Sequence, residues 1–169
     1  FIHLSTKGMP FVRWTVMPVL ALCLFGCNFL GGILPANDPG NNLAYQVAQG
    51  VARNTDTQAV ILTGGVGSPV SVYSKIYLPY FAHRKVLVVD WVLGKGGGEL
   101  GAVAHGITVL KNQGCAVYFL SELEQDGAVV GALAQRHALS AQMLVSFFRS
   151  LPRKDKVFLP DGNHLVRIN

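Results

Sequence analysis

The stretch KVLVVDWVLGKGGGELGAV, residues 85–103, places Asp90 at the end of an apolar run and a glycine-dense segment directly after it. The segment consists of Gly94, Lys95, Gly96, Gly97 and Gly98. Glycines between a strand and a helix let backbone N–H groups approach a phosphate, and the helix N-terminus adds a favourable dipole. We therefore expect this segment to bind a phosphorylated ligand. Its lysine precedes the glycines, so the spacing is not that of a Walker P-loop.

The same stretch, continued to about residue 125, resembles the phosphoribosyl pyrophosphate signature of type I phosphoribosyltransferases. In KVLVVDWVLGKGGGELGAVAHGITVLKNQGCAVYFLSELE, an apolar strand ends at an acidic residue and is followed by a glycine-containing loop, a helix, a glycine turn and another strand. Upstream, STKGMP at residues 5–10 is similar to the pyrophosphate-binding loop of the family through Thr6, Lys7 and Gly8.

The resemblance implies a role for each part. Asp90 would be the catalytic residue and would accept hydrogen bonds from the ribose hydroxyls, while the glycine segment would hold the 5′-phosphate. Catalysis in this family is mostly positioning and charge stabilisation of an oxocarbenium-like ribose as pyrophosphate, bound with Mg²⁺, leaves. The implied setting is purine salvage in the cytoplasm, with a phosphorylated ribose as the small-molecule partner, Mg²⁺ as the cofactor, no nucleic-acid partner, and a homodimer as one assembly.

The chain departs from the family at positions that contact the ligand. Trp91 stands where the family has a second acidic residue, and Lys95 and Gly98 stand at its two threonine positions. Half of the acidic ribose clamp and two hydroxyl contacts to phosphate are therefore missing. We expect a diverged phosphoribosyltransferase-like protein that binds phosphoribosyl pyrophosphate or a nucleoside 5′-phosphate, with transferase activity either retained or lost.

An α/β-hydrolase is the alternative. VILTGGVGS would supply a strand and the loop beside the oxyanion hole, and PDGNHLV would supply a late histidine, His164. The Gly-x-Ser-x-Gly nucleophile elbow is absent. Ser121 is the serine nearest to the elbow position, and Asp161 lies too close in sequence to His164 for the usual triad. This alternative predicts a hydrolase-like domain without a standard nucleophile.

Other polar residues carry weaker predictions. Glu122 and Glu124 could form a general acid–base pair, but two carboxylates at i and i+2 in a loop are more often solvated. His105 is expected on a helix surface or packed against its neighbours. His137 has no second ligand at helical spacing, so we predict no metal site.

Alternation of apolar strands and amphipathic helices predicts the fold class. We expect an α/β domain with three layers, a mostly parallel sheet with helices on both faces, as in phosphoribosyltransferases. Ligands of such sheets bind at the carboxyl ends of the strands. The expected central strands are residues 58–63, 86–91 and 115–120.

The chain has 169 residues, a formal net charge of +5 and 50% hydrophobic residues, which excludes a disordered protein and fits one domain. We expect an N-terminal apolar segment and linker at 1–40 and the α/β domain at 41–169. The segment contains Leu-Phe-Gly-Cys ending at Cys27, a lipoprotein-like signal that would attach the chain to a membrane on the periplasmic side. That location conflicts with the cytoplasmic one.

Overall fold

The computed structural model describes residues 10–28, 30, 38, 40 and 42–169. The chain divides into two compact units, Phe1–Asn42 and Leu43–Asn169. In the first unit, helix α1 (Pro10–Asn28) contains Pro18 and carries Cys27 as an exposed free thiol. Among the described residues, no helix combines the length and apolar character needed to cross a membrane.

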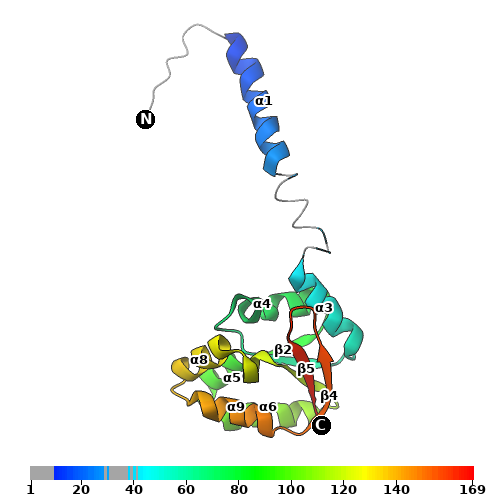
Figure 1. The fold of residues 1–169 in the computed structure, drawn as a ribbon, viewed down its shortest axis with the longest axis vertical. Helices are drawn as coiled ribbons and strands as arrows, with labels where there is room; N and C mark the ends of the chain where they lie inside the picture. Colours follow the sequence, from blue (N-terminus) through cyan, green and yellow to red (C-terminus); the bar gives the residue numbers. More distant parts are fainter. Residues whose placement is uncertain (1–9, 29, 31–37, 39, 41) are drawn as a thin grey trace. The chain divides into compact units, whose positions relative to one another are not determined.

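The second unit is an α/β domain built around a five-stranded sheet (Figure 1). Its elements follow one another in the order α3 (Leu43–Asn54), β1 (Val60–Thr63), α4 (Pro69–Tyr77), η2 (Leu78–Ala82), β2 (Lys85–Val88), α5 (Val89–Lys95), α6 (Leu100–Asn112), β3 (Val117–Leu120), α7 (Glu122–Gln125), α8 (Gly127–Arg136), α9 (Ala141–Ser150), β4 (Arg153–Phe158) and β5 (His164–Ile168). The α/β class is as the sequence predicts.

The sheet is mixed. Its strand order is β2-β1-β3-β5-β4, and β1 pairs in parallel with both β2 and β3. Strand β5 is antiparallel to β3, and β4 is antiparallel to β5. The expectation of a mostly parallel sheet is therefore correct for the first three strands and wrong for the last two. The chain returns from β4 through a short turn, and such a connection can only join antiparallel neighbours.

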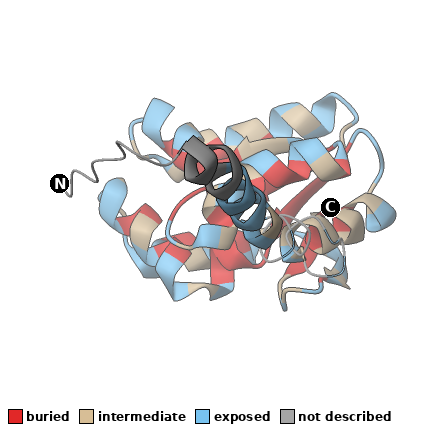
Figure 2. Cartoon of the chain, turned by 90° about the horizontal axis from the view of Figure 1, so that it is seen from above, coloured by how far each residue is buried: buried red, intermediate tan, exposed pale blue. Residues whose placement is uncertain are grey.

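Helices cover both faces of the sheet because successive strand residues point to opposite sides. Leu62 and Phe119 pack in one core cluster with residues of α5, α6, α8 and α9. Ile61 and Tyr118 pack in the other, with α3, α4 and η2. Figure 2 shows buried residues concentrated in the interior of this unit, with exposed residues on the outer sides of the helices.

Strand β2 is shorter than the sequence suggests, which changes the position of Asp90. The parallel register with β1 ends at the pair Thr63 and Val88, and α5 begins at Val89. Val89 and Leu93 have helical spacing and are both fully buried in one core cluster. The apolar run that predicts a strand through residue 91 is therefore half strand and half helix.

Candidate functional site

A doubly wound sheet binds its ligand at the carboxyl ends of neighbouring parallel strands. In this chain, those strands are β1 and β3. After β1 the chain turns to α4 on one face, and after β3 it turns to α7 and α8 on the other. Neighbouring parallel strands whose connections leave in opposite directions open a crevice at their carboxyl ends. Residues 64–68 and residues 121–124 follow the carboxyl ends of these two strands.

The loop GGVGS at residues 64–68 joins β1 to α4 and packs closely against α8. Gly65 and Gly67 have φ angles of +75° and +87°, and a Cβ at Gly67 would lie 2.4 Å from the carbonyl oxygen of Ala128. Side chains are thus excluded where the loop packs against α8. Ser68 then caps α4, since its hydroxyl accepts a hydrogen bond from the N–H of Ser71.

Glu122 lies in α7, just beyond the carboxyl end of β3, and is 1% exposed. Its Oε1 accepts hydrogen bonds from the Thr63 hydroxyl at 2.6 Å, the Gly64 N–H at 2.8 Å and the Ser71 hydroxyl at 3.0 Å. Within the described chain, no ion pair or hydrogen bond reaches Oε2. One oxygen therefore fixes the carboxyl group, and the other is left for a proton or a ligand.

The environment of Glu122 favours its protonated form. Burial raises the pKa of this carboxyl above the ordinary value of 4.5, and the hydrogen bonds from Thr63, Gly64 and Ser71 only partly oppose the shift. The negative charge of Asp126 raises the pKa further. A buried carboxyl with a raised pKa in a crevice is typical of acid–base sites.

Tyr77, at the end of α4, faces the same region. Tyr77 is 5% exposed, and among the described residues its hydroxyl has no hydrogen-bond partner. Burial, and then the negative charges of Glu122 and Asp161, raise the pKa of Tyr77 well above its usual range. The phenol is therefore a neutral group with an unused donor and acceptor.

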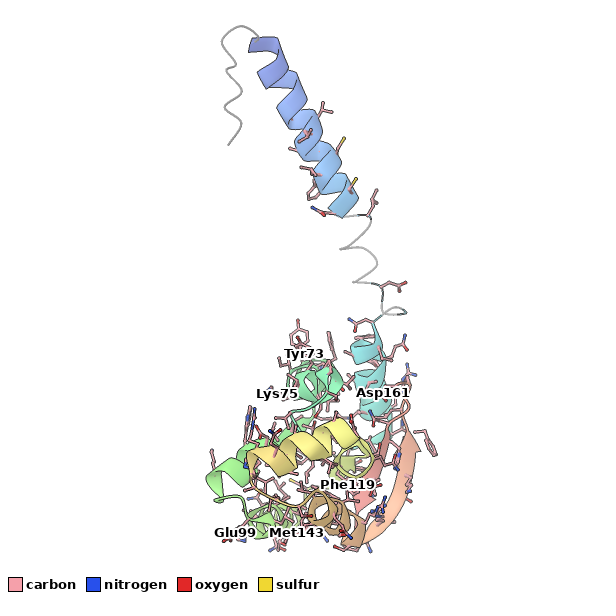
Figure 3. The ribbon with its side chains drawn as sticks, turned by 60° about the vertical axis from the view of Figure 1, so that its left-hand side comes forward. Tyr73, Lys75, Glu99, Phe119, Met143 and Asp161 are labelled. Atoms are coloured by element: carbon pink, nitrogen blue, oxygen red, sulfur yellow. The ribbon has the colours of Figure 1, made fainter. Side chains whose placement is uncertain are left out.

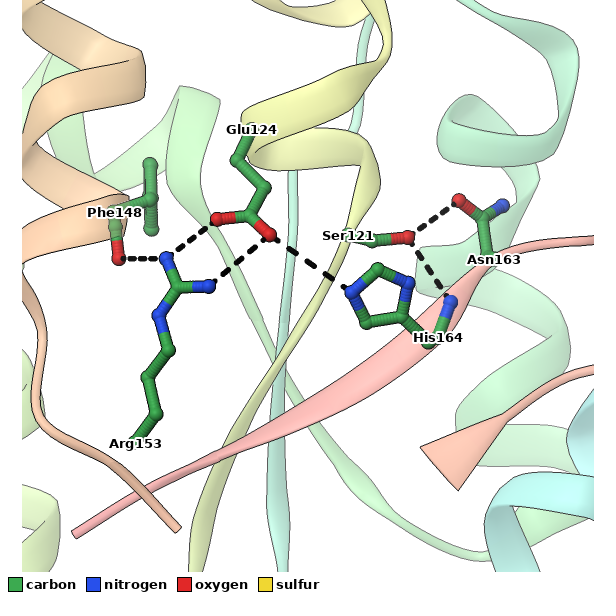
Figure 4. Close-up of polar contacts among 6 residues, drawn as sticks. All are labelled: Ser121, Glu124, Phe148, Arg153, Asn163 and His164. Atoms are coloured by element: carbon green, nitrogen blue, oxygen red, sulfur yellow. Dashed lines mark hydrogen bonds and ion pairs between the residues drawn. The ribbon is translucent and has the colours of Figure 1, made fainter. Parts of the chain in front are cut away.

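Glu124, two residues beyond Glu122, has a different environment (Figure 4). Its Oε2 accepts a hydrogen bond from the Arg153 guanidinium at 2.6 Å, and Arg153 also donates to the carbonyl of Phe148. On the other side, Glu124 Oε1 is 3.8 Å from Nε2 of His164. The expectation that both glutamates are solvated is wrong, because α7 places both of them under the surface.

His164 begins β5 and is 5% exposed, and its Nε2 has no hydrogen-bond partner in the part of the chain that the structure describes. Burial, and then the positive charge of Lys156, lower the pKa of His164 below 6.5, although Glu124 opposes the shift. The imidazole is therefore neutral at neutral pH. It becomes a cation only in acid, where it would compete with Arg153 for Glu124.

The residues of the predicted hydrolase site lie close together but do not form a triad. Ser121 is 1% exposed; its hydroxyl donates to Oδ1 of Asn163 and accepts from the backbone N–H of His164. The oxygens of Asp161 accept from the N–H and the side-chain amide of Asn163. The Ser121 hydroxyl thus ties β3 to β5, and its contacts are not those of an activated nucleophile.

Asp90 does not stand at the end of a strand. It lies in the first turn of α5, is 8% exposed, and pairs through Oδ2 with Arg136 at 2.7 Å and through Oδ1 with His137 at 3.0 Å. Both carboxylate oxygens are thus paired with side chains at the end of α8. His137, for which the sequence indicated no second metal ligand, is one of the two partners of Asp90.

The glycine segment is a turn between two helices. Gly94 and Lys95 belong to α5, and α6 begins only at Leu100. The N–H groups of Gly96 and Gly98 donate to the backbone carbonyls of Val92 and Leu93 at the end of α5. A Cβ at Gly98 would lie 2.9 Å from the carbonyl oxygen of His137, so the glycine allows close packing against α8. The expected strand–loop–helix phosphate cradle is therefore not formed by this segment.

The remaining predicted site residues and the metal can be placed briefly. Thr6, Lys7 and Gly8 lie outside the described residues. Within the described chain there is no group of three or more side chains suited to holding a metal ion. The Mg²⁺ that the resemblance implies stays a prediction.

The sequence singled out Glu122 but not the residues that the fold brings around it. Thr63, Ser71 and Tyr77 are common residue types in ordinary positions, and Thr63 is 59 residues away from the glutamate that it contacts. The available signal was the loop GGVGS after a buried strand, which marks the carboxyl edge. Comparison with family models, curated proteins and solved structures finds no match to this chain.

Proposed function

We propose that residues 43–169 form an α/β domain that binds a small organic ligand in the crevice between β1 and β3, and that Glu122 exchanges a proton with this ligand. The observation that carries the proposal is the Glu122 carboxyl group. It is buried at the carboxyl ends of β1 and β3, and its three hydrogen-bond donors all contact Oε1. Its second oxygen supplies the acid or base of a proton-transfer step.

The mechanism follows from the environment of this carboxyl group. Neutral donors hold Glu122 in one orientation, and burial keeps the proton on the carboxyl group at a pH where an exposed glutamate would have lost it. A ligand that brings positive charge, or that develops negative charge on a nearby atom, draws this proton out. Glu122 would then act as a general acid, and in the reverse direction as a general base.

A phosphorylated ribose remains one candidate for the ligand, now placed at a different loop. The residues that open α4, Pro69 and Val70, line a pocket at this edge of the sheet. A phosphate there would meet the N-terminal end of a nine-residue helix. This placement would retain a phosphorylated ribose as a ligand without Asp90 or the segment 94–98.

The experiment measures ligand binding and proton exchange together. The full chain is titrated calorimetrically with D-ribose, ribose 5-phosphate, phosphoribosyl pyrophosphate with Mg²⁺, and a series of primary amines, in two buffers of different ionisation enthalpy. A ligand of this site should shift the amide resonances of Gly64 and Ser71, while the resonance of Gly97 stays unchanged. Its proton exchange should disappear in Glu122→Gln.

The matched control is Glu99→Gln, which removes one exposed carboxylate at the start of α6. It should leave both affinity and proton exchange unchanged. The proposal is wrong if no ligand of the panel shifts Gly64 in a way that depends on Glu122. It is also wrong if proton exchange persists in Glu122→Gln.

The location of the chain has a separate test. We propose attachment to a membrane through Cys27, which is exposed on α1, as an alternative to the cytoplasm. Fractionation of cells that express the full chain should place it with membranes, and Cys27→Ser should release it. Cys23→Ser, four residues earlier on the same helix, is the control. Equal distribution of all three chains would exclude lipid attachment.

A further inference from the structure

Four large side chains lie on the surface of the α/β unit around α4. Tyr73, Ile76 and Tyr80 recur at i, i+3 and i+7 along α4 and η2, and Trp91 lies near the beginning of α5. Each of the four is more than half exposed. A surface that gathers apolar and aromatic side chains of this size usually contacts a partner or a membrane. We call these four residues the aromatic face.

Lys75 connects the two helices that carry the aromatic face. Its Nζ lies 5.6 Å from the centre of the Trp91 ring, which is a cation–π distance. Ile76 follows Lys75 directly in α4. Figure 3 shows Tyr73 and Lys75 on α4, on the outside of the α/β unit. The aromatic face therefore spans α4 and the beginning of α5, with an ammonium group between them.

The exposed charges around this face are positive. Between the beginning of α4 and the end of α5, Lys85 and Lys95 are exposed and Lys75 is half-buried. The one carboxylate in this part of the chain, Asp90, is buried and ion-paired. Lys95 follows Trp91 at i+4, so both side chains lie on the same side of α5. The face thus fits a partner that combines an apolar layer with negative charge.

An anionic lipid bilayer has both properties. Tryptophan and tyrosine concentrate at the level of the lipid headgroups, where the ring is in an apolar layer and its polar atom meets water. Lysines beside them extend to the lipid phosphates. A single-stranded nucleic acid would also stack on aromatic rings, but Ile76 offers no ring on which a base could stack. A second copy of the chain would bring the same lysines together, and like charges at an interface are unfavourable.

We propose that the aromatic face binds the surface of an anionic lipid bilayer. Its four side chains enter the headgroup layer, while Lys75 and Lys95 contact the lipid phosphates. This contact is independent of Glu122, and it adds a second membrane contact to the lipid proposed at Cys27. A single lipid chain binds reversibly, and stable attachment needs a second signal of this kind. Residues 28–42 would tether the α/β unit to the lipid, so even weak binding by the face becomes effective.

The fluorescence emission of Trp91 measures this contact directly. The sequence contains two tryptophans, Trp14 and Trp91. The full chain with Trp14→Phe and Cys27→Ser therefore reports on Trp91 alone and carries no lipid at residue 27. Emission is recorded with an excess of vesicles made of phosphatidylcholine alone, or of phosphatidylcholine mixed with phosphatidylglycerol. It should move to shorter wavelength with the anionic vesicles only, and high salt should reverse the change because salt screens the lysines.

Variants of the same chain separate the contributions of charge and apolar surface. Lys95→Ala should lower the ratio of lipid-bound to free Trp91 roughly five-fold, the effect of one lysine near an anionic bilayer. Lys154→Ala, at an exposed position in β4, should leave this ratio unchanged. Ile76→Ser should abolish the change in emission, whereas Met143→Ser, on the exposed side of α9, should not. All four substituted side chains are exposed, so circular dichroism should show that every variant keeps the fold.

The inference is wrong if the emission of Trp91 does not respond to vesicles, responds equally to both kinds, or loses as much in Lys154→Ala as in Lys95→Ala. A change without vesicles that grows with protein concentration would assign the face to a second copy of the chain. Quenching by an oligothymidylate, with no response to vesicles, would assign it to a single-stranded nucleic acid. None of these results bears on Glu122 or on lipid attachment at Cys27, so failure here leaves the proposed function to its own tests.

Discussion

Glu122 and Glu124 are two residues apart on one turn of helix, and both are buried. Neutral hydroxyl and amide donors hold the first, whereas an arginine holds the second, with a neutral histidine nearby. The comparison shows how one short helix assigns two carboxyl groups to different tasks. The countercharge makes Glu124 part of the structure, and its absence at Glu122 leaves a proton that can be moved.

The two glutamates also connect different parts of the fold. Glu122 links the ends of β1 and β3 through Thr63 and Gly64, on the parallel side of the sheet. Glu124 links α7 to β4, on the antiparallel side, through Arg153. Loss of Glu124 should therefore lower stability, whereas loss of Glu122 should mainly affect ligand and proton binding.

The largest expected effect is that of Glu124→Gln. It removes the partner of Arg153, whose side chain is only 26% exposed, and leaves a guanidinium without countercharge. Breaking such a pair costs about 2–3 kcal/mol, somewhat less than for a fully buried pair. Urea unfolding measures the loss, and Glu99→Gln should change stability by less than about 0.5 kcal/mol. An equally small change in Glu124→Gln would contradict the structural role of the pair.

Ser71→Ala should have the next largest effect. The Ser71 hydroxyl donates to Glu122 and accepts from the N–H of Gly65, both in the interior. Removing it leaves a buried amide unpaired, which should cost about 1–2 kcal/mol in the free energy of unfolding. Loss of this donor should also raise the pKa of Glu122 further. Ser150→Ala, where the hydroxyl is exposed and bonds only to the carbonyl of Phe147, is the control in the same unfolding experiment.

The two sides of the sheet should respond to pH in opposite directions. Because the pKa of Glu122 is raised by burial, the folded chain binds more protons than the unfolded chain above pH 4.5, so stability falls as pH rises through the raised pKa. Because the pKa of His164 is lowered by burial, the unfolded chain binds more protons below pH 6.5, so stability falls as pH drops through the lowered pKa. Unfolding curves recorded at several pH values measure how stability depends on pH. Glu122→Gln should remove the loss of stability with rising pH, and His164→Gln should remove the loss with falling pH. A flattening of the opposite slope in either variant would reverse the assignment.

The smallest effect is expected for Glu122→Gln just above pH 4.5, where the raised pKa keeps the glutamate protonated. A glutamine presents the same acceptor oxygen to Thr63, Gly64 and Ser71. The free energy of unfolding of Glu122→Gln should therefore differ from that of the wild type by less than about 1 kcal/mol. A much larger loss would mean that the carboxyl group is ionised in the folded chain.

The sequence predicts the elements better than the site, for physical reasons. The strands expected at residues 58–63 and 115–120 are found as β1 and β3, because runs of apolar and β-branched residues are local signals. The direction of β4 and β5 depends on which strands pair with each other. The periodicity of apolar residues carries no information about strand pairing. The environment of Glu122 depends on hydroxyls 51 and 59 residues away, and the helical end of KVLVVDWV depends on where the register with β1 stops.

The position of β5 in the sheet governs the order in which the chain can fold. Residues 164–168 lie between β3 and β4, so the edge of β3 stays unpaired until these residues have left the ribosome. A nascent chain that ends near residue 150 would carry an open strand edge, and Glu124 would lack Arg153. Such edges are templates for pairing with other chains. Translation that pauses in this segment should therefore yield aggregates rather than a shortened soluble domain.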